Sequence, residues 1–398
     1  MISLAKKNLC TGCGACAYIC PKHCITMKEN EIGVVLPEID TSNCIECGRC
    51  QHICPILSPL KLNSPRKAYA AWSTDENERF TSASGGIAAE VYKDAIESGN
   101  MTVGASQNQD FSVSLQIADS LEQIQVFKNS KYVFSSALEA YPQIARLLKN
   151  IERSFFVIIA LPCQIAAFKS IFKRYEDRFL YIDIVCHGTT PLSYLQQHIK
   201  YLENKYKENA VSMFFRDPNT NTYTFTFTLY NSTGQRFCIR TIEGGDAYQV
   251  GYHKKMTYRE NCYHCLFAQS NRIGDITLGD YHGLGLCGTC SFDDKNVSLV
   301  LVHTDKGNAL LNRLIEKRKI IVYERPLEEP IRGEIQLRHP STKTKERFDF
   351  ESLIKKNKGD FFLTMSIVLK RYNRRKKINE LMSLPRRIAR KLKRIIFK

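Results

Sequence analysis

Eight cysteines in the first 54 residues repeat one spacing twice, beginning at Cys10 and again at Cys44. Each run holds three cysteines with two residues between neighbours, then a fourth after three more residues and directly before a proline. This spacing is typical of proteins that bind two 4Fe-4S clusters, in which the fourth cysteine of each run binds the cluster of the other run. The expected ligand sets are Cys10, Cys13, Cys16 and Cys54 for one cluster, and Cys20, Cys44, Cys47 and Cys50 for the other.

A zinc site and a disulfide framework are the alternatives for these cysteines. Zinc takes four ligands, often as two pairs, and not three closely spaced cysteines with a fourth before proline. Disulfides belong to oxidising compartments, whereas sixteen cysteines in a chain without an apolar leader argue for a reducing one. The two runs therefore predict a ferredoxin-like domain that transfers one electron at a time.

Four further cysteines are candidate ligands of a third cluster. Two of them follow predicted buried strands, and two form a pair separated by two residues; they are Cys163, Cys186, Cys262 and Cys265. The alternatives are that the first two are ordinary buried thiols and that the pair binds zinc. Cys287 and Cys290 form a competing pair, whereas Cys24 and Cys238 have no partner at ligand spacing and read as plain thiols.

A partner reaction that involves two electrons needs a converter, and flavin is the usual one because it accepts a hydride and releases single electrons. No GxGxxG motif follows a predicted strand. Residues 82–86, Ser-Ala-Ser-Gly-Gly, precede a predicted helix and are a candidate phosphate site, because glycine permits close approach and a helix N-terminus favours an anion. The alternative is a simple helix cap. Lys128 to Tyr132 offer a cation, a hydroxyl and an aromatic ring.

A mixed sheet is expected to position these residues. Residues 155–161 and 179–185 are apolar runs typical of buried parallel strands, and a helix over 165–172 joins them. Because ligands gather at the carboxyl ends of parallel strands, we expect Cys163 and Cys186 to lie close together. His187 either contacts a cofactor or packs inside the protein. Further strands are predicted over residues 67–72, 99–105, 111–117, 225–230, 276–280 and 297–303.

This pattern predicts an α/β (α+β) fold with a mixed, partly parallel sheet and an N-terminal dicluster ferredoxin-like domain. The predicted divisions are the ferredoxin-like domain at 1–60, the N-terminal part of the body at 66–150, its C-terminal part at 151–345, and a basic, partly amphipathic tail at 346–398. Residues 57–65, with two prolines and two serines, read as the linker after the first domain.

The net charge of +17 is concentrated in the tail, where residues 367–398 hold thirteen Lys or Arg and one acidic residue. We therefore expect no nucleic-acid-binding face on the body. The tail either docks as a basic amphipathic helix on an anionic membrane surface or stays solvated. No run reaches the roughly 18 apolar residues of a spanning helix, so the predicted location is cytoplasmic, or peripheral at the inner face of the membrane. The apolar positions are Leu384, Ile388, Leu392, Ile395 and Ile396.

Taken in order along the chain, several short motifs resemble those of the coenzyme F-420 hydrogenase/dehydrogenase beta-subunit family, over roughly residues 1–345. Among the members of this family, the chain most resembles those of bacterial polysaccharide pathways. Two departures stand out: Ala160-Leu-Pro-Cys163 replaces the usual Gly-Thr-Pro-Cys, and the loop after His282 carries the extra Cys287 and Cys290. The motifs are residues 84–86, 130–133, 161–164, 186–188, 262–265, 278–280, 293–300 and 347–348.

The resemblance implies an iron–sulfur flavoprotein oxidoreductase that binds two 4Fe-4S clusters, a third cluster on Cys163, Cys186, Cys262 and Cys265, and FAD. Relatives act on a deazaflavin coenzyme or on other organic substrates, and receive electrons from a donor protein or a reduced coenzyme. Lys131 and His187 are the candidate catalytic residues. The alternative is a non-catalytic electron-relay subunit of a larger redox complex. The candidate FAD contacts are Ser84, Gly85, Gly86, Ser130, Lys131 and Tyr132.

Overall fold

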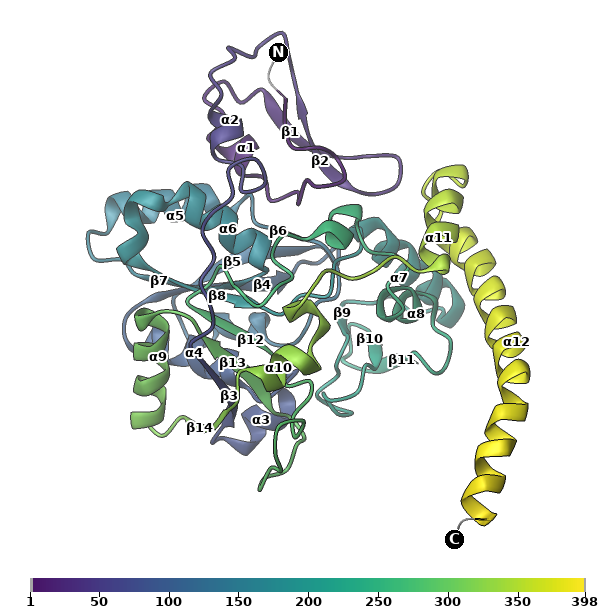
Figure 1. Cartoon of the computed structure of the whole chain (residues 1–398). Coiled ribbons are helices and arrows are strands. Elements are labelled where there is room, and N and C mark those ends of the chain that lie inside the picture. Colours follow the sequence, from purple (N-terminus) through teal and green to yellow (C-terminus); the bar gives the residue numbers. More distant parts are fainter. Residues whose placement is uncertain (1–2, 397–398) are drawn as a thin grey trace.

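The computed structural model describes the backbone of residues 3–396, with side chains through residue 378 and at residue 382. A nine-stranded sheet forms the centre of the body, which confirms the predicted α/β (α+β) fold (Figure 1). In spatial order its strands are β14 (Ile320–Arg325), β3 (Lys67–Ser73), β13 (Ser298–Val302), β12 (Ile276–Asp280), β8 (Phe179–Ile184), β7 (Phe156–Ala160), β4 (Met101–Gln107), β5 (Val113–Ala118) and β6 (Ser135–Ser136).

The four central strands, β12, β8, β7 and β4, run parallel, whereas β13, β3, β14 and β5 join the sheet in antiparallel pairs. The apolar runs predicted as buried strands are β7 and β8, and every residue of β7 is buried. Successive side chains of a strand point to opposite faces, so Val157 and Ile159 enter one core while Phe156 and Ile158 enter the other. The sheet is therefore covered on both faces.

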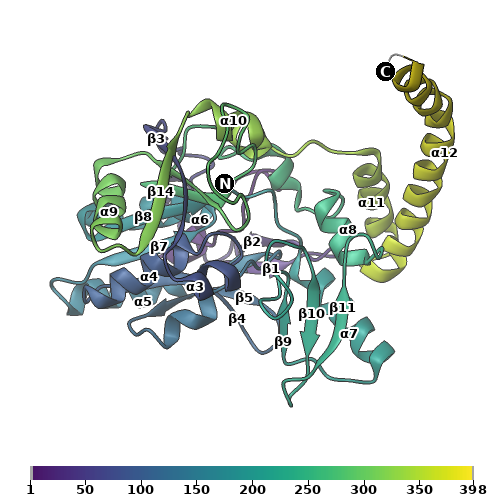
Figure 2. The same ribbon diagram turned by 90° about the horizontal axis from the view of Figure 1, so that it is seen from below.

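Different helices cover these two faces. Helices α4 (Ile87–Glu97) and α9 (Asp305–Glu316) pack on one face, and α5 (Ala140–Asn150) and α6 (Pro162–Ile171) pack on the other. Helix α6 begins at Pro162, a position where proline costs no backbone hydrogen bond. Two short helices, α3 (Glu76–Thr81) and α10 (Glu328–Gly333), complete the body and lie at its β3–β14 side (Figures 1 and 2).

The N-terminal domain contains a hairpin, β1 (Ile25–Glu29) and β2 (Val35–Ile39), and two short helices, α1 (Ala15–Ile19) and α2 (Arg49–His52). Each helix begins after a glycine in the left-handed conformation, Gly14 with φ 79° and Gly48 with φ 72°, which repeats the same local structure in both cysteine runs. The domain lies on the side of the sheet that α5 and α6 cover (Figure 1). Cys13 of this domain lines the same cavity as Cys163, which follows β7, and Cys186, which follows β8.

A second, three-stranded sheet forms a lobe beside the main sheet. Its strands β9 (Ser212–Phe214), β10 (Phe227–Tyr230) and β11 (Arg236–Arg240) share a core with helices α7 (Leu192–Tyr206), α8 (Ala247–His253), α11 (Lys345–Lys356) and α12 (Phe361–Ile396).

The first part of the predicted tail at 346–398 is packed against the lobe. The side chains of Phe350, Phe361, Met365 and Val368 are buried in the core of the lobe, so α11 and the first turns of α12 belong to the packed structure. The rest of α12 extends away from the body (Figure 1). The predicted apolar positions Leu384, Ile388, Leu392, Ile395 and Ile396 lie outside the described side chains. Within the described part of the chain, every helix is too short or too polar to cross a membrane.

Candidate functional site

The structure brings the eight N-terminal cysteines together in two groups of four, each lining a small cavity. Each group combines three cysteines of one run with the fourth cysteine of the other run, as the spacing predicts. We call Cys10, Cys13, Cys16 and Cys54 the first cysteine set, and Cys20, Cys44, Cys47 and Cys50 the second cysteine set.

The two sets are neighbours within the N-terminal domain, because Cys16 lies in α1 and Cys20 directly follows that helix. Cys47 of the second set is exposed, so this set lies nearer the solvent. The structure also adds Cys24 to the second cavity, with its Sγ 3.3 Å from the Sγ of Cys20. This contact was not predicted, because Cys24 falls outside both cysteine runs.

The four cysteines predicted to bind a third cluster also line one cavity, and Cys13 of the first set borders it. We call Cys163, Cys186, Cys262 and Cys265 the third cysteine set. Cys163 follows β7 and Cys186 follows β8, while Cys262 lies in the 3-10 helix η3 (Glu260–His264) and Cys265 directly follows it.

The chemistry of the third set suits a metal cluster. Burial disfavours a thiolate, which raises the pKa of Cys265 to about 11 and also raises the pKa of Cys163. Four half-buried sulfurs close together are stable as thiolates only beside positive charge, which the iron ions of a cluster supply. In addition, the backbone N–H of Thr189 donates to the Sγ of Cys262 at 3.4 Å, as expected around a thiolate ligand.

Arg259 joins the N-terminal domain to the body between the first and third cysteine sets. Its buried guanidinium donates to the carbonyls of Thr11 at 2.7 Å and Val35 at 3.1 Å, and lies over the ring of Phe134 at 4.4 Å. A Cβ at Gly12, whose φ is +68°, would come within 2.6 Å of the guanidinium. The contact between the N-terminal domain and the body therefore requires glycine at position 12 and the guanidinium of Arg259 opposite it.

A larger cavity of about 470 Å³, the main cavity, adjoins the third cysteine set. Its volume is typical of sites that bind small molecules or cofactors. It lies at the carboxyl ends of β7, β8 and β12, where ligands of parallel sheets bind. The wall between the main cavity and the third set's cavity is shared by Ser135, Leu161, Gln164, Cys186, His187, Gly188 and Thr189.

One end of the main cavity matches the predicted phosphate site. Ser84, Gly86 and the first turn of α4 line it, and the N-cap residue Gly86, with φ 81°, provides no capping side chain. The first N–H groups of α4 thus remain available to an anion. A Cβ at Gly85 would come within 2.5 Å of the carbonyl oxygen of Ala71, so only glycine fits beneath this turn. The residues present therefore fit the pyrophosphate of a dinucleotide such as FAD.

The loop of Ser130, Lys131 and Tyr132 lines the cavity as well. The Lys131 ammonium is buried and donates to three carbonyls of its own loop, including that of Lys128 at 2.8 Å. Burial lowers the pKa of Lys131 to about 7, because no carboxylate compensates the buried charge among the described residues. Lys131 therefore shapes this wall, and its protonation state changes near neutral pH.

Arg216 is a buried residue of the site that the sequence did not indicate. It forms an ion pair with Asp280 (Nη1–Oδ1 3.2 Å) and donates to the Tyr132 hydroxyl at 2.9 Å and to the carbonyl of Ala83. Its guanidinium also lies over the ring of Phe225 at 4.5 Å. A single arginine after two phenylalanines carries no local signal, because its hydrogen-bond partners are 64 to 133 residues away in sequence.

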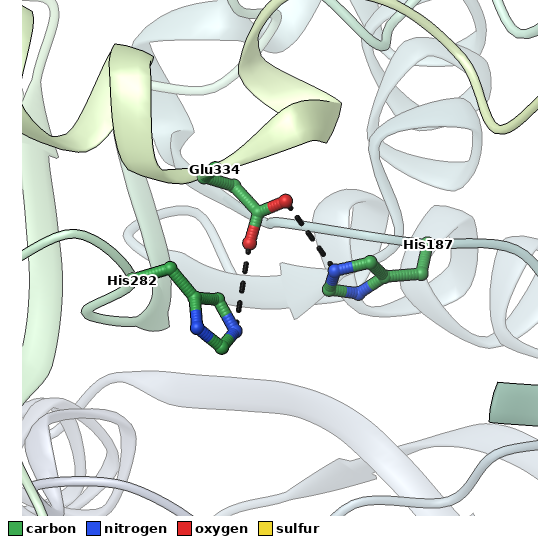
Figure 3. Close-up of side chains that lie close together, drawn as sticks. All are labelled: His187, His282 and Glu334. Carbon is green, nitrogen blue, oxygen red and sulfur yellow. Dashed lines mark ion pairs between the residues drawn. The ribbon is translucent and has the colours of Figure 1, made fainter. Parts of the chain in front are cut away.

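His187 lines the main cavity, as expected of a residue that contacts a cofactor or substrate. Its Nε2 lies 3.3 Å from one oxygen of Glu334, and the Nε2 of His282 lies 3.6 Å from the other (Figure 3). The sequence indicated only His187 of these three. In contrast, Cys287 and Cys290 are absent from the described walls of the main cavity and of the third set's cavity. Their loop is anchored elsewhere, by the backbone N–H of Cys287 to Glu329 at 3.1 Å.

The body and the N-terminal domain of this protein each match a known protein family. Residues 155–326 match the C-terminal domain of the coenzyme F420 hydrogenase/dehydrogenase beta subunit, and residues 9–56 match the 4Fe-4S dicluster domain. No curated protein matches the chain. A chain of the F420-reducing [NiFe] hydrogenase complex from Methanosarcina barkeri is 18% identical, with a TM-score of 0.44 over 75% of this chain and 90% of that one. The protein thus belongs to the coenzyme F420 hydrogenase/dehydrogenase beta-subunit family, with an N-terminal 4Fe-4S dicluster domain, and is an iron–sulfur redox protein.

Proposed function

We propose that this protein is an iron–sulfur flavoprotein oxidoreductase that exchanges electrons with an organic or deazaflavin-type substrate in the main cavity. One observation carries the proposal: three cysteine sets follow one another from the exposed Cys47 to the wall of that cavity. Cys13 borders both the first and third sets' cavities, and Cys186 borders both the third set's cavity and the main cavity. A protein that only stores clusters would not need three cysteine sets that lie in a row and end at a cavity.

In this proposal each cysteine set binds one 4Fe-4S cluster, and the main cavity binds FAD. The clusters supply one-electron transfer, and the flavin exchanges either single electrons or a hydride. Ser84, Gly85, Gly86 and the first turn of α4 would hold the phosphates, as the available N–H groups of that turn suggest.

The remaining cavity residues hold and orient the bound molecules. Ser130, Lys131 and Tyr132 form the wall next to the phosphate end, and the stacking of Tyr132 on Tyr252, with ring centroids 4.7 Å apart, fixes that wall. Lys131 and His187 are the groups that could hold or donate a proton at the substrate, since both line the cavity and since amines and imidazoles act as general acids and bases in enzymes.

The partners follow from the same arrangement. Electrons would come from a donor protein or a reduced coenzyme at the exposed second set. The basic C-terminal part of α12 would bring the protein to an anionic membrane surface from the cytoplasmic side.

Anaerobic purification with iron, sulfide and flavin counted per chain tests the proposal. Three clusters predict about twelve irons, together with one FAD. About eight irons without flavin would contradict the proposal and leave an electron-relay subunit.

Variants of the third set test its ligand role directly. Cys163→Ser and Cys262→Ser should each lose about four irons per chain while the dicluster domain keeps its eight. Cys290→Ser is the matched control, because Cys290 lies outside the walls of the three cysteine-lined cavities as described. Equal iron content in all three variants would show that the third set binds no cluster.

A further inference from the structure

Two imidazoles and a carboxylate converge beside the main cavity from three distant segments. His187 follows β8, His282 follows β12, and Glu334 follows α10. One ligand atom from each residue lies within 4.8 Å of the other two. Figure 3 shows both rings directed at the same carboxylate, one toward each oxygen.

The charge of this group is not balanced by a permanent cation. The Glu334 side chain is only 3% exposed, and its described ion pairs are with the two imidazoles alone. It also accepts a hydrogen bond from the backbone N–H of Gln336 at 3.0 Å. A buried carboxylate is costly unless positive charge lies beside it, and imidazole is charged only when it is protonated. A bound cation would supply this charge at any pH at which the carboxylate is ionised.

Close backbone packing brings the segments that carry these three residues together. A Cβ on Gly333 would lie 2.2 Å from the carbonyl oxygen of His282, and a Cβ on Gly283 would lie 2.6 Å from the Cα of Gly333. The segments that carry His282 and Glu334 therefore touch through two glycines. On the other side, the Ser341 hydroxyl donates to the carbonyl of His187 at 3.0 Å and ties that segment to the chain after Glu334.

We propose that His187, His282 and Glu334 form a binding site for a divalent transition-metal ion, with Zn²⁺ as the best match. Two imidazoles and one carboxylate are the protein ligands of one class of catalytic zinc site, in which the fourth position stays open. Ligand atoms about 2.1 Å from a tetrahedral ion lie roughly 3.4 Å apart. The two nitrogen–oxygen separations, 3.3 Å to one carboxylate oxygen and 3.6 Å to the other, are close to this value, and one ligand atom from each of the three residues lies within 4.8 Å of the other two.

The open position of this site faces the main cavity. The side chains of His187 and His282 are 38% and 49% exposed and line the cavity, whereas the carboxylate behind them is buried. An ion held there would polarise an oxygen of the bound substrate as a Lewis acid. The substrate class that this site would take is therefore one with a carbonyl, hydroxyl or phosphate oxygen near the reacting atoms. Metal binding itself does not depend on the proposed flavin.

Zinc titration of the anaerobically purified full-length protein, followed by dialysis and metal analysis, tests this site. Wild type should retain about one Zn²⁺ per chain, and His282→Ala and Glu334→Gln should bind it at least about tenfold more weakly. His339→Ala is the matched control and should bind as wild type, because the His339 side chain is exposed and its hydrogen bond in the described structure is to the carbonyl of Pro340. Iron is counted in each sample, so that zinc in a cysteine set emptied of iron is recognised.

Two outcomes would overturn the site. The first is wild-type protein with full iron content that retains no Zn²⁺. The second is equal retention by wild type, His282→Ala and Glu334→Gln, which would place the zinc elsewhere. Flavin content, measured on the same samples, decides the proposed oxidoreductase separately.

Discussion

At the scale of single residues, burial decides the chemistry of the site more than residue type does. Lys131 is an ordinary lysine in sequence, yet its ammonium is enclosed with three carbonyls and its pKa falls to about 7. Arg216 is buried as well, but Asp280 and the Tyr132 hydroxyl keep its charge compensated. The two cations beside one cavity therefore differ: one can lose its proton near neutral pH and the other cannot.

The lowered pKa of Lys131 predicts a pH-dependent stability difference between wild type and Lys131→Met. Between about pH 7 and 10 the unfolded chain binds a proton at Lys131 that the folded chain has lost, so this lysine makes the protein more stable as pH rises. Relative to Lys131→Met, the unfolding free energy of wild type should rise by up to about 1.4 kcal/mol per pH unit in this window.

Thermal unfolding midpoints of both proteins, measured anaerobically from pH 7 to 9.5, check this prediction. Titrations of other groups are shared by the two proteins and cancel in the difference. A difference that stays constant with pH would mean that Lys131 keeps its proton in the folded state.

At the scale of secondary-structure elements, the start of α4 is the feature on which the proposed flavin binding depends. Gly85 and Gly86 let the chain pass close under β3 and turn into the helix, so that the first N–H groups of the helix reach the main cavity. The helix carries no capping side chain at this end, and an anionic group would take that place.

Gly86→Ala should therefore lower flavin retention. Both Gly86, with φ +81°, and Gly99, with φ +72°, lie in the left-handed region, where alanine costs about 1 kcal/mol. Gly99→Ala is the matched control, because Gly99 lies at the other end of α4, away from the cavity walls, with open space around it. Flavin absorbance per chain, compared between the two variants, is the measurement. If both variants lose flavin to the same extent, the effect is one of general stability.

At the scale of the whole molecule, the N-terminal domain must dock so that the first cysteine set lies next to the third. Arg259 is one of the residues that hold this position, since its guanidinium binds carbonyls of the N-terminal domain while its backbone belongs to the segment before Cys262. It is also a positive charge beside both sets of thiolates.

Arg259→Gln should lower the reduction potentials of the clusters in both neighbouring sets, because removal of a nearby positive charge disfavours the reduced, more negative state. It should also free the N-terminal domain, so that proteases cleave the segment at residues 57–65 faster. Redox titration followed by electron paramagnetic resonance gives the potentials, and limited proteolysis reports the docking.

Arg259→Lys separates the two roles of this residue. Lysine keeps the charge but not the planar fork of donors, so it should preserve the potentials better than the docking. Unchanged potentials in Arg259→Gln would show that the cation is only structural.

The sequence by itself determined the parts of this protein that depend on near neighbours in the chain. The cysteine spacing predicted how the eight N-terminal cysteines group into the first and second cysteine sets, because three ligands of each cluster sit on one short loop at fixed intervals. The apolar runs that became β7 and β8 identified the centre of the sheet, and the order of parallel strands explains why Cys163 and Cys186 meet. The sequence did not indicate that the first part of the predicted tail is packed against the lobe, since the buried residues of α11 and α12 are spaced like those of any amphipathic helix.

Only the tertiary structure decided which residues complete the site. Arg216 meets Asp280, Arg259 meets Thr11, and Glu334 meets His187 and His282 across separations of 52 to 248 residues. No local pattern marks such pairs, because each side chain is an ordinary polar residue until folding buries it beside its partner. Burial then sets the charge and orientation of these groups, and both depend on packing that forms only when the sheet and its neighbouring lobe are assembled.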